Sequence, residues 1–147
     1  MKPLRYFEEF LEEGIVKKQT PDILRARSLM KESEETYFVL KEIITKLGLG
    51  DKNANYIIKN SYDVIMELIR AKMILEGFNS SGQGIHEAEV SYLRELDFNE
   101  TEIEFANQLR YFRNGILYYG KSFDAEYAQK VLDFLEKIYR RLKKTNI

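Results

Sequence analysis

The sequence contains no cysteine and no tryptophan, and only two of its 147 residues are proline. Without cysteine the chain can form no disulfide and offers no thiolate to a metal, which fits a reducing compartment, so we expect a cytoplasmic protein. No apolar run approaches the length of about 18 residues that a membrane span needs, and the N-terminus does not resemble a signal peptide. We therefore expect no membrane partner, no metal and no cofactor.

Neither sign of charge is in excess, because 23 lysines and arginines stand against 24 aspartates and glutamates. This balance argues against a nucleic-acid coat protein or a polybasic membrane binder, although it allows a local basic patch. Few prolines and abundant Lys, Glu, Leu and Ile favour helices. Ten tyrosines and nine phenylalanines suit a core or an interface built from rings.

The apolar periodicity predicts an all-α fold, an antiparallel bundle of about five helices with a four-helix up-and-down core. We expect a single domain over residues 1–147, with a short N-terminal helix or arm over 1–19 and the bundle over 20–145. No strand pattern is present. Helices are expected over residues 4–13, 20–47, 54–76, 85–97 and 99–119, and from Ser122 or Asp124 to the C-terminal region.

Residues typical of helix ends set these boundaries. Thr20 and Pro21 predict a hydroxyl N-cap followed by proline at the first helical position, and Gly48 predicts a C-cap. Asn99 followed by Glu102 is typical of a capping box. The glycine- and serine-rich segment 77–84 lacks the Gly-Lys-Ser/Thr that would follow in a phosphate-binding loop, so we interpret it as a plain connector.

The helix predicted over residues 54–76 is apolar around most of its circumference, which places it at the centre of the bundle. Its narrow polar strip consists of Lys59, Asp63, Glu67 and Arg70.

Two polar features outside that helix have competing interpretations. His86 is the only histidine, and a lone histidine cannot make a zinc site, so we interpret it as a solvated residue or one near a helix cap rather than as a catalyst. The basic run 140–144 either complements the dipole of a helix C-terminus or contacts an RNA backbone.

One stretch, residues 108–120, combines two arginines, an asparagine and three tyrosines. On a helix Arg113, Asn114 and Tyr118 lie on adjoining faces. Arginine binds phosphate through paired donors, and asparagine can orient a hydroxyl, but tyrosine is a poor base near neutral pH. The stretch therefore predicts a phosphodiester site, with a helix–helix interface of Arg on Tyr as the alternative. The candidate RNA- or nucleotide-binding residues are Arg110, Arg113, Asn114 and Tyr119.

Gly115 lies in the middle of this predicted helix, where glycine costs up to about 1 kcal/mol relative to alanine. Such a glycine is tolerable where another backbone approaches closely. A second subunit crossing at Gly115 would explain it.

The segment 112–119 resembles the signature of the HEPN superfamily (higher eukaryote and prokaryote nucleotide-binding domains). That signature is an arginine, a polar residue, about three further residues and a histidine. Residues 61–69 and 71–78 also resemble prokaryotic HEPN proteins, and the likeness covers roughly residues 22–140. By position Arg113 matches the arginine and Asn114 the polar residue, while Tyr118 stands in the place of the histidine.

The resemblance implies a helical homodimer whose two motifs face each other across a cleft. Many members are metal-independent endoribonucleases, and many are toxins paired with a small nucleotidyltransferase antitoxin. We therefore expect a homodimer that binds RNA or a nucleotide, with a nucleotidyltransferase as partner and weak or absent cleavage. One alternative is an active endoribonuclease with Arg113, Asn114 and Tyr118 as catalytic residues. The other is a non-enzymatic helical interaction module.

Overall fold

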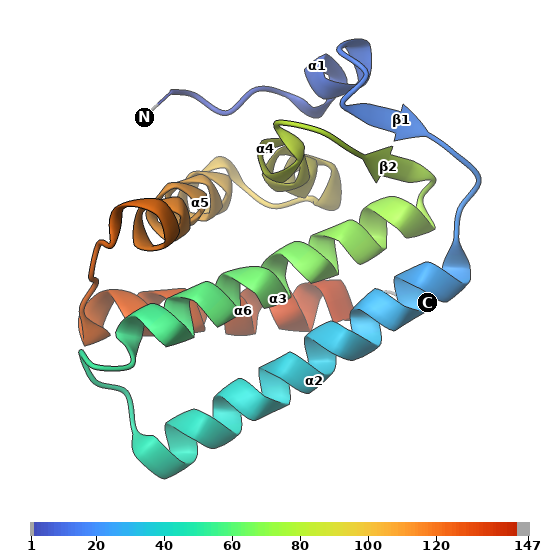
Figure 1. The fold of residues 1–147 in the computed structure, drawn as a ribbon. Helices are drawn as coiled ribbons and strands as arrows, with labels where there is room; N and C mark the ends of the chain where they lie inside the picture. Colours follow the sequence, from blue (N-terminus) through green and yellow to red (C-terminus); the bar gives the residue numbers. More distant parts are fainter. Residues whose placement is uncertain (1, 144–147) are drawn as a thin grey trace.

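Three long helices form the base of the molecule: α2 (Ile23–Leu47), α3 (Ala54–Leu75) and α6 (Ala125–Lys143) (Figure 1). The computed structural model describes residues 2–143, without the side chains of Leu117 and Tyr118. Helix α3 packs against α2 on one side and against α6 on another. The described residues are mostly helical, so the all-α fold class is confirmed.

The remaining elements lie over α3, on the side that α2 and α6 leave open (Figure 1). They are α1 (Phe7–Glu12), β1 (Val16–Lys18), β2 (Phe78–Ser80), α4 (Ile85–Ser91), the 3-10 helix η1 (Tyr92–Leu96) and α5 (Glu100–Tyr119). Both α4 and α5 contact α3 and each other. The place where these three helices meet is therefore built from segments far apart in the sequence.

Helix α3 is the central helix, as its apolar circumference predicts. Fourteen of its 22 residues are buried. The predicted polar strip, from Lys59 to Arg70, is only half-buried and is the part of α3 that the other helices do not cover completely. The burial of α3 thus fixes which of its side chains can form a site.

The helix ends agree with the sequence in most places. Gly48 ends α2 with a φ of 75°, and Asn99 and Glu102 form the predicted capping box at the start of α5. The N-cap of α2 is a correction, because Asp22 caps it by accepting from the Arg25 N–H at 3.0 Å, in place of Thr20. The preceding chain is held to the end of α3 by the bond from the Gln19 N–H to the Gly77 carbonyl at 2.8 Å, so α2 begins later than predicted.

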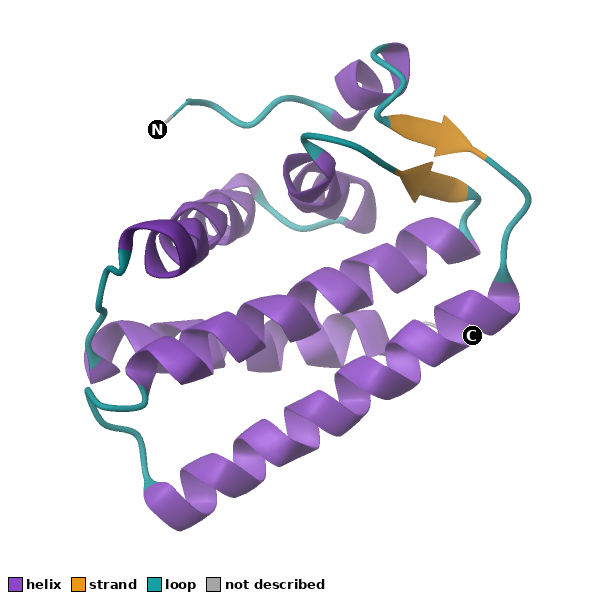
Figure 2. Ribbon diagram, viewed as in Figure 1, coloured by secondary structure: helices purple, strands orange, loops and turns teal. Residues whose placement is uncertain are grey.

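A two-stranded antiparallel sheet is the element that the sequence did not predict (Figure 2). Strand β1 pairs with β2 so that Val16 lies opposite Ser80. Each strand has three residues, too few for an alternating pattern to be seen. The segment interpreted as a plain connector therefore contributes a strand, which ties the N-terminal region to the bundle.

Gly77, just before β2, shows why this junction needs glycine. Its φ is +86°, and a Cβ atom there would meet the Gln19 carbonyl oxygen at 2.7 Å. A side chain at this position would both strain the backbone and push β1 away from β2.

The helix predicted over residues 85–97 is in fact two elements, α4 followed by η1, and it ends at Asp97, whose φ is 63°. Asp124 caps α6, as one of the two predicted alternatives, by accepting from the Tyr127 N–H at 2.9 Å. Lys144 and the predicted end of the bundle at residue 145 lie outside the described residues. Within the described residues, no helix combines the length and the apolar character needed to cross a membrane.

Candidate functional site

Tyr62 lies at the centre of the place where α3, α4 and α5 meet. Its side chain is buried. The guanidinium carbon of Arg113 from α5 lies 5.3 Å from the centre of the Tyr62 ring, and the His86 ring from α4 meets the same ring edge-on at 6.3 Å. Arg113 and His86 therefore lie against the same aromatic ring, although they come from different helices.

Arg113, the arginine singled out from the sequence, is held against two consecutive residues of α3. It stacks on Tyr62 and its Nη2 donates to Oδ1 of Asp63 at 3.2 Å. Its Nε is buried and has no hydrogen-bond partner among the side chains that the structure describes. A guanidinium has five N–H donors, so most of the donor capacity of Arg113 is not used within the described chain.

His86 belongs to a second part of the site, which contains the fully buried carboxylate of Glu89. Arg70 from α3 binds this carboxylate through two donors, Nε to Oε2 at 2.6 Å and Nη2 to Oε1 at 3.1 Å. His86 Nδ1 lies 3.0 Å from the same Oε1. The spacing of three residues places His86 and Glu89 on one face of α4.

Charges from all three helices act on the Tyr62 hydroxyl. Burial, followed by the negative charge of Glu89, raises the pKa of the Tyr62 phenol well above its ordinary value. Arg110 and Arg113 act in the opposite direction and lower it. Tyr62 therefore stays neutral at physiological pH and serves as a ring and a hydrogen-bonding group, not as a base.

Glu67 completes the polar strip of α3 next to Asp63. Burial, and then the charges of Glu32 and Asp63, raise the pKa of Glu67 to about 7. Its Oε2 is buried and lacks a partner within the described part of the chain. The strip thus contains a carboxyl group whose charge changes near neutral pH.

The other residues predicted for the site lie elsewhere. Asn114 and Tyr119 line a hollow of about 600 Å³ between the end of α5 and the turn before α6. Arg110 donates Nε and Nη2 to Oδ1 of Asn107 at 3.1 and 2.9 Å, and its charge, like that of Arg113, acts on Tyr62. Neighbouring residues on a helix diverge by about 100°, so Arg113 and Asn114 face different surroundings. The side chain of Tyr118 lies outside the described part of the structure.

Gly115 has an ordinary neighbour within its own chain. A Cβ atom there would lie 3.5 Å from Cδ of Lys121, which is normal van der Waals contact. The Lys121 N–H also donates to the Gly115 carbonyl at 3.3 Å. The close neighbour of Gly115 within the described chain is therefore a flexible side chain, not a crossing backbone.

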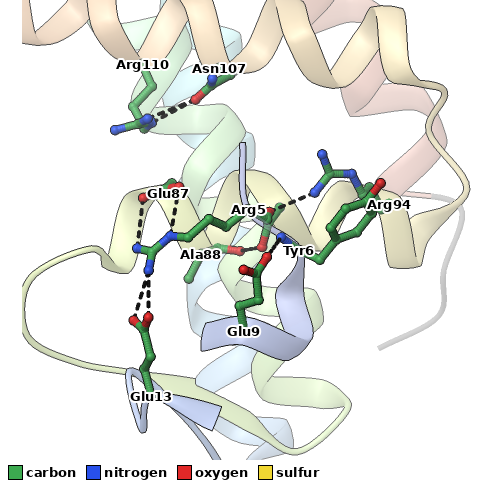
Figure 3. A network of polar contacts seen from close by, with 10 residues as sticks. Arg5, Tyr6, Glu9, Glu13, Glu87, Ala88, Arg94, Asn107 and Arg110 are labelled. Atoms are coloured by element: carbon green, nitrogen blue, oxygen red, sulfur yellow. Dashed lines mark hydrogen bonds and ion pairs between the residues drawn. The ribbon is translucent and has the colours of Figure 1, made fainter. Parts of the chain in front are cut away.

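A separate polar network fastens the N-terminal arm, and Figure 3 shows it beside the Arg110–Asn107 pair. Arg5 donates Nη1 to both oxygens of Glu13 at 2.9 Å and contacts Glu87 through Nε and Nη2. Arg94 donates to the backbone carbonyls of Leu4 and Arg5. These arginines connect α1 and the arm to α4 and η1.

The basic end of α6 is also engaged. Arg141 donates to both carboxylate oxygens of Glu102 at 3.1 Å and stacks on Phe98 at 3.8 Å. Lys143 contacts Glu34 at 3.0 Å. These pairs give the basic run a structural role between helices, in addition to the favourable position of cations at a helix C-terminus.

Tyr62, Asp63, His86 and Glu89 are the members of the site that the sequence did not assign to it. The signal for Asp63 was present, because it belongs to the polar strip of α3. His86 and Glu89 had the spacing of neighbours on a helix, but nothing in the sequence placed α4 beside Arg113. The described residues contain no cluster of three histidine, aspartate or glutamate side chains that could hold a metal ion.

Comparison with known proteins gives no relative, since no family model, curated protein or solved structure matches this chain.

Proposed function

We propose that the protein binds RNA or a nucleotide through the Arg113 site, as a HEPN-like homodimer that partners a nucleotidyltransferase. The observation that carries the proposal is the state of Arg113. Its guanidinium is oriented by Tyr62 and Asp63, yet it makes one ion pair, at 3.2 Å, within the described chain. An oriented arginine with unused donors is suited to a phosphate, which accepts two parallel hydrogen bonds.

A neighbouring ring supports a nucleic-acid ligand. The Arg110 guanidinium carbon lies 4.8 Å from the centre of the Tyr111 ring, and Tyr111 is exposed. Stacked tyrosine and arginine side chains offer a flat surface to unpaired bases, while arginine also attracts the backbone. Arg110 and Arg113 both act on Tyr62, so a phosphate bound at Arg113 would lie near this surface.

Cleavage by the motif residues alone has less support than binding. Asn114 lines a hollow at the end of α5 that does not include Arg113. A tyrosine at position 118 would also be a weak base, because the ordinary pKa of a phenol is about 10. Binding is therefore the activity for which Arg113 and its neighbours give the stronger argument.

Fluorescence anisotropy with a labelled single-stranded RNA of mixed sequence, measured over a series of salt concentrations, tests the proposal. We expect Arg113→Ala to weaken binding about tenfold or more and to reduce the salt slope by about one. Arg113→Lys keeps the charge but loses the paired donors, so its affinity for RNA should lie between those of the wild type and Arg113→Ala. Arg140→Ala is the matched control at the basic end of α6, where the side chain is 75% exposed, and should bind like the wild type.

Two results would contradict this function. Wild-type protein that binds neither the RNA nor mononucleotides would refute it directly. An Arg113→Ala protein that still binds RNA like the wild type but sediments as a monomer, while the wild type is a dimer, would make Arg113 a residue of the subunit contact and not of the RNA site.

A further inference from the structure

We propose that the hollow at the end of α5 is a subsite for one unpaired base of the RNA strand whose phosphate lies at Arg113. This inference rests on the RNA-binding function proposed above and names what that function selects, a strand with an unstacked base. The hollow measures about 600 Å³ and lies between the last turns of α5 and the segment that leads to α6. Its volume is within the range of about 300–1,000 Å³ that is common for ligand sites.

The wall of the hollow consists largely of aromatic rings, which belong to Tyr111, Phe112, Tyr119 and Phe123. The Phe112 and Phe123 rings lie 4.8 Å apart at an angle of 34°. Beside them Tyr111 is exposed, and Tyr119 is 78% exposed. Packed rings next to rings that remain in water offer a surface on which a flat base can stack. Such stacking binds single strands of any sequence, because every base has a flat face.

The polar groups of the hollow suit the edge of a base and its phosphate. Asn114 contributes an amide, which both donates and accepts hydrogen bonds, as the Watson–Crick edge of an unpaired base does. Lys121 is the one charged side chain among the described residues that line the hollow, and it is exposed. A lining with one cation and no carboxylate is complementary to an anionic ligand, such as a nucleotide of the strand.

The turn that carries Lys121 and Phe123 is fixed by Asn55 of α3. Asn55 Nδ2 donates to the Lys121 carbonyl at 2.9 Å, and Asn55 Oδ1 accepts from the Phe123 N–H at 2.8 Å. Both ends of one amide thus bind backbone groups of the same turn, so the position of this wall does not depend on a ligand. A wall that is held in place before binding loses little conformational freedom when a ligand binds.

Gly115 also lines the hollow, and its missing side chain keeps the space open. The three atoms nearest to a Cβ atom at this position all belong to the side chain of Lys121. No crossing backbone is therefore the reason for a glycine in the middle of this helix within the described chain. A base that enters the hollow would come against Gly115, and close approach of a ligand is a usual reason for glycine.

The hollow and Arg113 lie on one continuous surface of α5. Because each residue turns the helix by about 100°, Arg110 follows Arg113 by about 60° around the axis, and Asn114 and then Tyr111 come next. The Arg110 guanidinium carbon lies 4.8 Å from the centre of the Tyr111 ring. Tyr111 is thus both the partner of Arg110 and part of the wall of the hollow. A strand held at Arg113 can pass over Arg110 and place a base in the hollow.

The test compares three labelled RNAs by fluorescence anisotropy: a short single strand, the same strand with abasic ribose at its central positions, and the duplex. The intact and abasic strands carry the same phosphate charge, so any difference between them reports on the bases. We expect the wild type to bind the intact strand at least about fivefold more tightly than the abasic strand or the duplex.

Variants in the wall of the hollow should remove this preference. Tyr119→Ala removes an exposed ring, and Gly115→Leu fills the space, so both should bind the intact strand about fivefold more weakly and the abasic strand within twofold of the wild type. Arg113→Ala should weaken the binding of both strands. Tyr56→Ala, at a tyrosine of α3 that is 47% exposed and does not line the hollow, is the matched control and should keep the preference.

A second readout uses the absence of tryptophan from the chain. Phe123→Trp places a single indole in the wall of the hollow, and its fluorescence should be quenched by the intact strand and not by the abasic one. The same measurement with a free mononucleotide separates the two sources of a base. Quenching by the mononucleotide but not by the intact strand would contradict a subsite for a base of the bound strand.

The remaining outcomes separate the subsite from the binding function. Equal affinity of the wild type for the intact and abasic strands overturns the subsite and leaves binding at Arg113 standing. A preference for the intact strand that persists in both Tyr119→Ala and Gly115→Leu has the same consequence. Absence of RNA binding by the wild type overturns both proposals.

Discussion

Two arginines on neighbouring elements, Arg94 and Arg113, show how differently one side chain can be used. All three guanidinium nitrogens of Arg94 in η1 donate hydrogen bonds. It donates Nε to Glu100 at 3.0 Å, Nη1 to the Arg5 carbonyl at 2.7 Å and Nη2 to the Leu4 carbonyl at 3.1 Å, and it lies 4.2 Å from the centre of the Tyr6 ring. Arg113 makes one ion pair, at 3.2 Å, with Asp63.

This difference separates a polar network that holds the structure together from one whose unused donors can bind a ligand. Every nitrogen of the Arg94 guanidinium donates to another part of the chain, so its role is to fasten the N-terminal arm. Figure 3 shows Arg94 beside Arg5, whose carbonyl accepts one of these bonds. The Nε of Arg113 is buried and has no partner among the described residues, although the side chain lies against Tyr62 and Asp63. Buried polar groups are normally satisfied, so an oriented arginine with a buried, unsatisfied donor suggests a site.

Glu89 should give the largest effect on stability. Glu89→Ala removes the partner of Arg70, whose side chain is only 27% exposed, and breaks a buried ion pair. We expect the free energy of unfolding to fall by about 3–5 kcal/mol, measured by urea denaturation. Lys46→Ala, at an exposed ion pair on α2, is the control and should change it by less than about 0.5 kcal/mol. A loss below about 1 kcal/mol for Glu89→Ala would mean that the pair is not the buried anchor described above.

Arg94 should come next. Arg94→Ala leaves two backbone carbonyls of the arm without their donor, and we expect a loss of about 1.5–3 kcal/mol by the same measurement. RNA binding should not change. A variant that folds with wild-type stability, or that loses RNA binding while folded, would break the distinction between the two arginines.

Glu67 gives an effect that depends on pH. Its pKa is about 7 in the folded protein against an ordinary value of 4.5, so between these values the folded state keeps a proton that the unfolded state has lost. The free energy of unfolding should therefore decrease as the pH rises from about 5 to 7. Because the side chain is only partly buried, we expect about 1–2 kcal/mol after allowing for screening.

Glu67→Gln removes this titration. Its stability should vary less over the same pH range, and it should exceed that of the wild type at pH 8. Denaturation at several pH values checks this, and an unchanged pH profile in the variant would assign the effect to another group.

Gly115→Ala should give the smallest effect. Alanine favours a helix by up to about 1 kcal/mol over glycine, and the added methyl would lie at ordinary contact distance from Lys121. We expect the melting temperature to stay the same or to rise by a few degrees, with the oligomeric state unaltered. If the variant loses stability or its oligomeric state, a second subunit does approach at Gly115.

The fold could be predicted from the sequence largely because its helices carry strong local signals. The apolar circumference of α3 and the capping box at Asn99 and Glu102 need no knowledge of the rest of the chain. The strands β1 and β2 have no such signal, since each is three residues long and their pairing joins segments more than 50 residues apart.

The site was predictable only in part for the same reason. Arg113 was found from its own chemistry, and Asp63 was visible as part of a polar strip. His86 was set aside because it is alone in the sequence, whereas its neighbours Glu89 and Tyr62 come together through the packing of α4 on α3. Residues that are adjacent on a helix, such as Arg113 and Asn114, were grouped although they face different surroundings.

The most direct test of the account compares Arg113→Ala with Arg94→Ala in two measurements on the same preparations, the dissociation constant for single-stranded RNA and the free energy of unfolding. We predict that Arg113→Ala weakens RNA binding at least about tenfold and lowers stability by less than about 1 kcal/mol, while Arg94→Ala lowers stability more and leaves RNA binding within twofold. The opposite pattern, or equal effects of the two variants on binding, would contradict the claim that Arg113, with its unused donors, is the ligand site.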